Sequence, residues 1–193
     1  MKLVFATNNA HKLKEVREMF QGKAEISSLK EIGCTADIPE TSPTIEENSL
    51  QKARYIYDQY GMDCFSDDTG LEVEALGGAP GVYSARYAGE PSNPERNRKK
   101  LLQEMEGHTN RKARFRTVIT LIIQGEVHQF EGIAEGEIST QENGEQGFGY
   151  DSLFIPKGYT QTFAQLGNSE KNRLSHRSKA MAALWEYINH HCL

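Results

Sequence analysis

Two adjacent acids, Asp67 and Asp68, follow a short apolar run in the segment CFSDDTGLEV, residues 64 to 73. We expect a buried strand that ends at this pair. Because neighbouring side chains of an extended segment point to opposite faces, one carboxylate can enter a site while the other caps or orients a neighbour. Carboxylate oxygens suit a hard cation such as magnesium, but aspartates ahead of a glycine such as Gly70 are also common turn formers. The segment alone leaves both interpretations open.

A polar loop, ATNNAHK at residues 6 to 12, is a second place for chemistry. It joins an expected strand to an expected helix, where backbone N–H groups and the positive end of the helix attract phosphate. Lys12 adds a positive charge. The sequence contains neither a Walker A pattern nor GxGxxG, so an ordinary surface loop stays open as an interpretation. Glu40, in a loop further along the chain, is another acidic candidate.

Two later segments carry rings and positive charges. GFGYD, residues 147 to 151, is typical of a loop that lays a ring against a planar base, or of an aromatic-anchored turn. EKNRLSHRSKA, residues 170 to 180, is typical of a binding segment or of the solvated basic face of a helix. Neither pattern decides between its two interpretations.

Periodicity and capping signals predict the elements that position these residues. Residues 2 to 6 are expected to form a strand, and apolar residues then recur at helical spacing from Leu13 to Gly22. TIEE, residues 44 to 47, is a capping box that begins a second helix, and Gly61 ends it. SNPE, residues 92 to 95, begins a third helix.

The second half of the chain predicts antiparallel strands and a last helix. Residues 115 to 123 and 126 to 130 flank Gln124-Gly125 as a hairpin, and residues 132 to 139 predict a further strand. Met181, Leu184, Trp185 and Ile188 form an apolar stripe on a C-terminal helix. The early strand–helix order favours some parallel pairing, so we expect an α/β fold with a mixed central sheet and flanking helices.

The composition limits the classes of function. A chain of 193 residues fits one domain, residues 1–193, and its net charge of -5 argues against binding nucleic acid. No apolar run approaches the roughly 20 residues of a membrane span, so we expect a cytoplasmic protein without a membrane partner. Three cysteines, Cys34, Cys64 and Cys192, are too few and too scattered for a disulfide framework, and we interpret them as reduced structural thiols.

Taken together, the segments resemble the inosine triphosphate pyrophosphatase family, whose members are also called XTP/dITP diphosphatases. The resemblance rests on six segments found in the same order and with similar separations. They are FATNNAHK (5–12), IPET (38–41), EENSLQKA (46–53), SDDTGLEVEALGGAPGVYSARYAG (66–89), GFGYDSLFIP (147–156) and EKNRLSHRSKA (170–180). The resemblance implies a mixed sheet in two lobes that enclose an active-site cleft, and a homodimer. It also implies magnesium-dependent hydrolysis of ITP, dITP and XTP to the monophosphate and pyrophosphate.

The resemblance also implies roles for individual residues. Triphosphate binding falls to Thr7, Asn8, Asn9, Ala10, His11 and Lys12, with positive charge added by Lys52 and Lys171. Metal binding falls to Glu40 and Asp68, and Asp68 is also the implied catalytic base. Thr69 is implied to border the substrate. The residues implied to hold the base are Phe148, Gly149, Tyr150 and Asp151, and those implied to contact its 6-oxo group are His176 and Arg177.

Two other functions fit the same residues. One is a pyrophosphatase for other modified or pyrimidine nucleoside triphosphates. The other is a nucleotide sensor that binds without cleaving, although a sensor needs no water-activating base such as Asp68.

Overall fold

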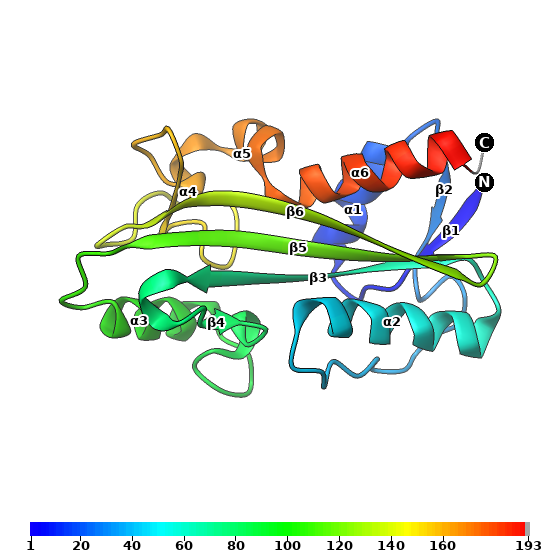
Figure 1. Ribbon diagram of the computed structural model, residues 1–193, viewed down its shortest axis with the longest axis horizontal. Helices are drawn as coiled ribbons and strands as arrows, with labels where there is room; N and C mark the ends of the chain where they lie inside the picture. The colour runs from blue at the N-terminus through cyan, green and yellow to red at the C-terminus, as the bar shows by residue number, and fades with distance from the viewer. Residues whose placement is uncertain (192–193) are drawn as a thin grey trace. The chain divides into compact units, whose positions relative to one another are not determined.

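The computed structural model describes residues 1–191, and Cys192 therefore lies outside the described residues (Figure 1). The elements in chain order are β1 (Lys2–Phe5), α1 (Ala10–Phe20), β2 (Glu25–Ser27), α2 (Ile45–Tyr60), β3 (Cys64–Val73), η1 (Glu74–Leu76), β4 (Pro80–Gly81), η2 (Ser84–Arg86), α3 (Pro94–Glu104), β5 (Lys112–Ile123), β6 (Glu126–Ile138), β7 (Phe154–Pro156), α4 (Phe163–Leu166), α5 (Asn168–Leu174) and α6 (His176–His191). No described helix has both the length and the apolar character that crossing a membrane requires.

The sheet is mixed, as expected. Its strand order is β2-β1-β3-β5-β6-β7, and β4 pairs with β3 off this path. Strand β1 pairs in parallel with β2 and β3, whereas β4 runs antiparallel to β3 and β7 runs antiparallel to β6. The predicted α/β fold with a mixed central sheet is confirmed.

The chain forms two compact units. Unit 1 comprises Met1–Asp68, Val118–Phe130 and the chain from Met181 on, and unit 2 comprises Thr69–Thr117 and Glu131–Ala180. The chain passes from one unit to the other within β3, β5, β6 and α6. The expected cleft and the single domain spanning residues 1–193 stay predictions.

Each unit has its own apolar core. In unit 1, Phe5 stacks on Phe65 with ring centroids 4.6 Å apart, and Phe20 meets Trp185 edge-on at 5.7 Å. In unit 2, Phe115 contacts Phe154 with centroids 4.6 Å apart. The predicted stripe of the last helix is confirmed, because Met181, Leu184 and Ile188 are buried.

Helix α1 begins earlier than the spacing of its apolar residues predicts. The side chain of Asn9 accepts hydrogen bonds from the backbone N–H groups of His11 and Lys12, which caps the helix so that it starts at Ala10. The expectation of a loop over residues 6 to 12 was therefore wrong at its end, because Ala10, His11 and Lys12 belong to the helix. Helix α2 follows its prediction, with Thr44 as the N-cap and Gly61 in the left-handed conformation at the C-terminus.

Strand β3 does not end at Asp67 and Asp68. It continues to Val73, because its distal part pairs with β4 at Leu71↔Gly81 and Glu72↔Pro80. The expectation of a strand that ends at this pair was therefore wrong, the structure does not support the turn interpretation, and both side chains project from a continuous strand. The strands expected on either side of residue 131 are likewise one strand, β6, joined to β5 by Gln124-Gly125 with positive φ at both residues.

Candidate active site

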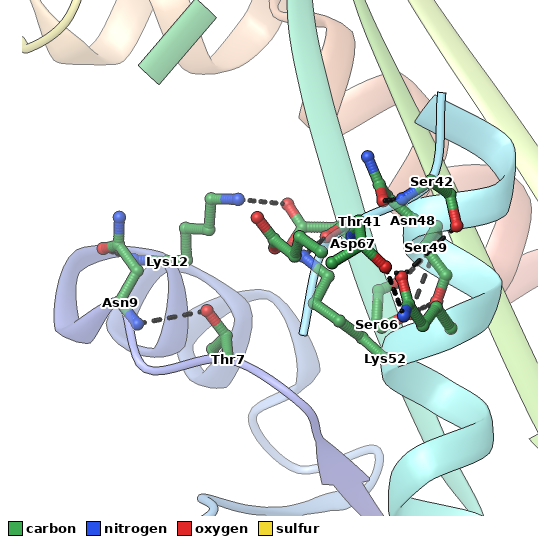
Figure 2. Close-up of polar contacts among 12 residues, drawn as sticks. Thr7, Asn9, Lys12, Thr41, Ser42, Asn48, Ser49, Lys52, Ser66 and Asp67 are labelled. Atoms are coloured by element: carbon green, nitrogen blue, oxygen red, sulfur yellow. Dashed lines mark hydrogen bonds and ion pairs between the residues drawn. The ribbon is translucent and has the colours of Figure 1, made fainter. Parts of the chain in front are cut away.

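The loop between β1 and α1 is held by its own side chains. The backbone N–H of Asn9 donates to Oγ1 of Thr7 over 3.1 Å (Figure 2). Oδ1 of Asn9 accepts from the N–H groups of His11 and Lys12 over 3.0 and 3.1 Å. Asn8, Asn9, Ala10 and His11 are exposed. The segment that the sequence assigns to phosphate is therefore ordered by its cap and accessible to a ligand.

Five charged side chains of unit 1 form what we call the acid–lysine cluster: Lys12, Glu40, Lys52, Asp67 and Asp68. Nζ of Lys12 lies 2.9 Å from Oδ2 of Asp67, which is fully buried (Figure 2). Nζ of Lys52 lies 2.5 Å from Oε1 of Glu40 and donates to the backbone oxygen of Asp67 over 2.5 Å. Residues that lie far apart in the sequence are thus joined by direct ionic contacts.

Electrostatics distinguish Asp68 from an ordinary surface acid. Burial raises the pKa of Asp68 to about 6, Lys52 acts in the opposite direction, and the charge of Glu40 raises it further. Burial acts to lower the pKa of Lys52, but the charges of Asp67 and Glu40 outweigh it, and the pKa stays above its ordinary value. The cluster therefore contains a firmly charged lysine beside a carboxylate whose pKa lies near neutral pH.

Helix α2 positions Lys52 and the Glu40 loop through polar residues on its buried face. Oδ1 of Asn48 accepts from the N–H of Ser42 over 2.8 Å, and Oε1 of Gln51 accepts from the N–H of Thr41 over 3.1 Å. These bonds hold the loop that carries Glu40 against the helix.

Ser49 and Ser66 attach the same helix to β3. Their hydroxyls lie 3.2 Å apart, and the Ser66 hydroxyl also donates to the backbone oxygen of Ser49. Sequence reasoning missed both serines and Asn48 as supports of the site. The available signal was the presence of Asn48, Ser49 and Lys52 within the apolar stripe of an otherwise amphipathic helix.

In unit 2, Asp151 connects Phe148, a predicted base-binding residue, to Lys171, a predicted positive charge for the triphosphate. Its Oδ2 accepts from Nζ of Lys171 over 2.6 Å and from the backbone N–H of Phe148 over 3.0 Å. Nζ of Lys171 also lies 4.3 Å from the centroid of the Phe148 ring, and Cζ of Arg177 lies 6.0 Å from it. The Phe148 ring is 47% exposed, so it is available to contact a ligand.

The remaining predicted residues of unit 2 are firmly placed. The backbone oxygen of Gly149 accepts from Arg98, and the Tyr150 hydroxyl donates to the backbone oxygen of Ser84 over 2.6 Å. The hydroxyl oxygens of Thr69 and Thr117 lie 2.8 Å apart. His176 is buried and stacks on Phe115, with ring centroids 4.8 Å apart and 17° between the planes.

The structure thus gathers the predicted residues into two groups. Lys12, Glu40, Lys52 and Asp68 belong to the acid–lysine cluster of unit 1, with Asp67 as an added member. Phe148, Asp151, Lys171 and Arg177 lie together in unit 2. Their roles toward a ligand stay predictions.

Comparisons with known proteins agree with this architecture. The Ham1 family matches residues 3–187. The chain is 54% identical over 188 residues to a dITP/XTP pyrophosphatase of Porphyromonas gingivalis, with 97% of each chain covered. It is 53% identical over 188 residues to a dITP/XTP pyrophosphatase of Flavobacterium psychrophilum, covering 97% of this chain and 99% of the relative.

Solved structures show the same fold. The Staphylococcus aureus Ham1 protein superimposes with a TM-score of 0.92 at 36% identity, and a HAM1 protein from Coxiella burnetii with 0.93 at 34%. Each comparison covers 98% of this chain and 99% of the other. The mixed sheet and the acid–lysine cluster define an α/β protein with a highly charged, partly buried site. The chain belongs to the Ham1 family.

Proposed function

We propose that the protein hydrolyses non-canonical purine nucleoside triphosphates, namely dITP, XTP and ITP, to the monophosphate and pyrophosphate. The observation that carries the proposal is the 54% identity, across 97% of the chain, to a relative named dITP/XTP pyrophosphatase. The acid–lysine cluster supplies the chemistry that such a reaction needs.

Asp68 is the proposed general base. Water attacks the α-phosphorus, the bond from that phosphorus to the bridging oxygen breaks, and pyrophosphate leaves. A base works best when its pKa lies near the working pH. Burial raises the pKa of Asp68 to about 6, so at pH 7 the carboxylate is mostly ionised and accepts a proton from water more readily than an ordinary aspartate.

The balance of charge in the cluster favours a bound cation. With every group ionised, the three carboxylates of Glu40, Asp67 and Asp68 outnumber the two ammonium groups of Lys12 and Lys52 by one. A polyanionic triphosphate therefore meets a cluster that is itself negative, and an additional positive charge is needed.

Magnesium fits this requirement. Protein sites commonly hold Mg²⁺ by one or two carboxylates together with substrate phosphates, and Glu40 and Asp68 would supply those carboxylates. When bound, the ion neutralises charge on the phosphates and stabilises the leaving pyrophosphate.

Unit 1 also supplies the proposed triphosphate contacts. Thr7 to Lys12 lie in the accessible segment at the start of α1, where the helix dipole and Lys12 favour an anion. For Lys171 the resemblance to the family implies a further positive charge toward the triphosphate. Because phosphoryl transfer leaves little covalent chemistry to the protein, catalysis rests on positioning and charge neutralisation.

Unit 2 supplies the proposed recognition of the base. The exposed face of Phe148 stacks on the purine, and His176 and Arg177 donate to its 6-oxo oxygen. Adenine presents an amino group at that position, so donors there would be left unpaired, at a cost of about 1–3 kcal/mol each. Two such contacts together cost about 2–6 kcal/mol, which is a factor of roughly 30 to 10⁴ against ATP. With a 6-oxo purine, both donors find an acceptor, and this favours ITP and XTP.

We also propose a cytoplasmic homodimer, as the resemblance to the family implies. Sedimentation velocity at micromolar concentration tests this proposal, since a species near the 21.7 kDa chain mass would contradict it.

Pyrophosphate release across a panel of nucleotides tests the proposed function. With magnesium, we expect rapid release from ITP, dITP and XTP and slow release from ATP, dUTP and dTTP. With EDTA in place of magnesium, release from every nucleotide should fall to background. A preference for pyrimidine nucleotides, or tight ITP binding without release over hours, would contradict the proposal.

A further inference from the structure

The first turn of α6 packs on strand β6 at a residue that has no side chain. A Cβ built on Gly132 would lie 1.9 Å from the backbone oxygen of His176 and 2.6 Å from the backbone nitrogen of Ala180. Real Cβ atoms essentially never approach other atoms closer than 3.0 Å. Both obstacles are backbone atoms, which cannot rotate away as a flexible side chain can.

Glycine is needed at this position because there is no room for a Cβ atom, and not because of the backbone conformation. Gly132 is absent from the glycines with positive φ, so an L-amino acid could adopt its backbone angles without strain. What an alanine could not avoid is the collision with α6. Replacing the hydrogen by a methyl group therefore acts directly on the placement of the helix.

Two further contacts attach the same turn to the sheet. Nζ of Lys179 donates to the backbone oxygen of Ile133, the residue after Gly132, over 2.8 Å. The His176 ring stacks on Phe115 of β5 with centroids 4.8 Å apart. The bare backbone of Gly132, the lysine bond and the stacked ring together fix where the first turn begins.

From this packing we infer that Gly132 determines base specificity by positioning His176 and Arg177. The inference rests on the proposed function, in which those two side chains donate to the 6-oxo group of the purine. Gly132 touches no ligand in this account. It is a positioning residue, and it acts through the helix that it allows to come close.

The size of the expected disturbance follows from the distances. Restoring 3.0 Å where the built Cβ lies 1.9 Å from the His176 oxygen requires a movement of about 1.1 Å. Hydrogen bonds of N–H to O lie within about 2.7–3.2 Å, so a shift of this size breaks contacts made by His176 and Arg177. The acid–lysine cluster has no member in α6 or β6, so its chemistry should continue.

Gly136 provides a matched control on the same strand. A Cβ there would lie 2.2 Å from the backbone oxygen of Ile155 and 2.7 Å from Cζ of Phe154. Gly136 is thus nearly as crowded as Gly132, but its added Cβ would meet β7 and not the backbone of α6. A general loss of stability should appear in both variants, whereas direct displacement of the α6 backbone should appear only at Gly132.

The test compares kcat/KM for ITP with kcat/KM for ATP in the full-length protein with magnesium. We expect Gly132→Ala to lower the ITP/ATP ratio at least tenfold, mostly through the ITP value, and Gly136→Ala to keep the ratio within twofold. An unchanged ratio in a folded Gly132→Ala protein, or an equal loss in Gly136→Ala, would overturn the inference.

Two more variants keep the outcome decisive. If Gly132→Ala does not fold, Lys179→Met removes the bond to Ile133 without adding bulk, and a folded Lys179→Met protein with the parent's ratio would overturn the inference. Arg177→Ala separates the inference from the proposed function. If Arg177→Ala keeps the parent's ITP/ATP ratio of kcat/KM, the proposed base-reading role itself is wrong. If the ratio falls in Arg177→Ala but not in Gly132→Ala, only the role of Gly132 is wrong.

Discussion

Nζ of Lys52 lies 2.5 Å from Oε1 of Glu40 and 2.5 Å from the backbone oxygen of Asp67. One buried ammonium group thus fixes both a proposed metal ligand and the strand that carries the proposed catalytic base. A lysine already bound in this way orients its neighbours, whether or not it also contacts a phosphate.

Lys52→Met should therefore raise the magnesium concentration needed for half-maximal activity. Loss of a group that orients a metal ligand typically costs about 10- to 100-fold in metal affinity or activity. A magnesium titration of ITP hydrolysis measures the effect. Lys99→Met is the control, because Lys99 also pairs with a glutamate, Glu95, but on the exposed surface of α3. The same magnesium requirement in Lys52→Met and the parent would contradict the positioning role.

Asp68→Asn should abolish turnover and still bind ITP. The amide keeps the shape of the carboxylate but cannot accept the proton of water. Isothermal titration with a non-hydrolysable ITP analogue, alongside single-turnover kinetics, separates binding from chemistry. A rate of pyrophosphate release within tenfold of the parent would remove Asp68 from the role of general base.

The same substitution should stabilise the protein at neutral pH when magnesium is removed with EDTA. The pKa of Asp68 is raised from 3.8 to about 6 in the folded state, so between these values the native state binds more protons than the unfolded state. Stability from this group is therefore lost as pH rises through that window. At pH 7 the cost of ionised Asp68 is about 2–3 kcal/mol.

Urea denaturation of the parent and Asp68→Asn at pH 4 and pH 7 measures this effect. The variant should be more stable than the parent at pH 7, and the difference should shrink toward pH 4. A variant that is less stable than the parent at pH 7 would show that ionised Asp68 does not destabilise the folded protein.

Phe148→Ala should raise KM for ITP by about tenfold and change kcat much less. Stacking of a base on an aromatic ring is worth about 1–3 kcal/mol, and the exposed Phe148 ring lies under Lys171. Tyr83→Ala is the control, since Tyr83 is another exposed aromatic residue of unit 2, at 56% exposure against 47% for Phe148. Equal KM values for Phe148→Ala and the parent would exclude stacking on this ring.

Cys64 should resist alkylation in the native protein at pH 8. Burial, with a smaller effect from the charge of Asp63, raises the pKa of its thiol to about 12, so almost no thiolate forms. Iodoacetamide labelling followed by peptide mass spectrometry should find the Cys64 peptide unmodified until denaturant is added. Rapid native labelling would show that unit 1 opens around β3.

Local signals predicted the parts of the fold that local chemistry decides. The Thr44 cap and the Gly61 stop of α2 depend on residues within one turn of each end, so the sequence shows both. The continuation of β3 past Asp68 depends on pairing with residues near Pro80, which overrides the turn preference of an Asp-Asp-Thr-Gly run.

The candidate site was predicted as a set of residues and not as a set of contacts. The types of Lys12, Glu40 and Asp68 point to phosphate and metal chemistry, but the sequence does not show which lysine meets which acid. Those pairs form through tertiary packing of α1, α2 and β3. The closeness of α6 to Gly132 is also tertiary, and a single glycine in a strand gives only a weak signal of it.

The position of bond cleavage is the most direct test of the account, and hydrolysis of ITP in water enriched in oxygen-18 measures it. Attack of water on the α-phosphorus places one heavy oxygen in inosine monophosphate and none in pyrophosphate. Mass spectrometry of both products should show this distribution with the parent protein and magnesium. Heavy oxygen in pyrophosphate, or release of inorganic phosphate as the first product, would contradict the proposed reaction.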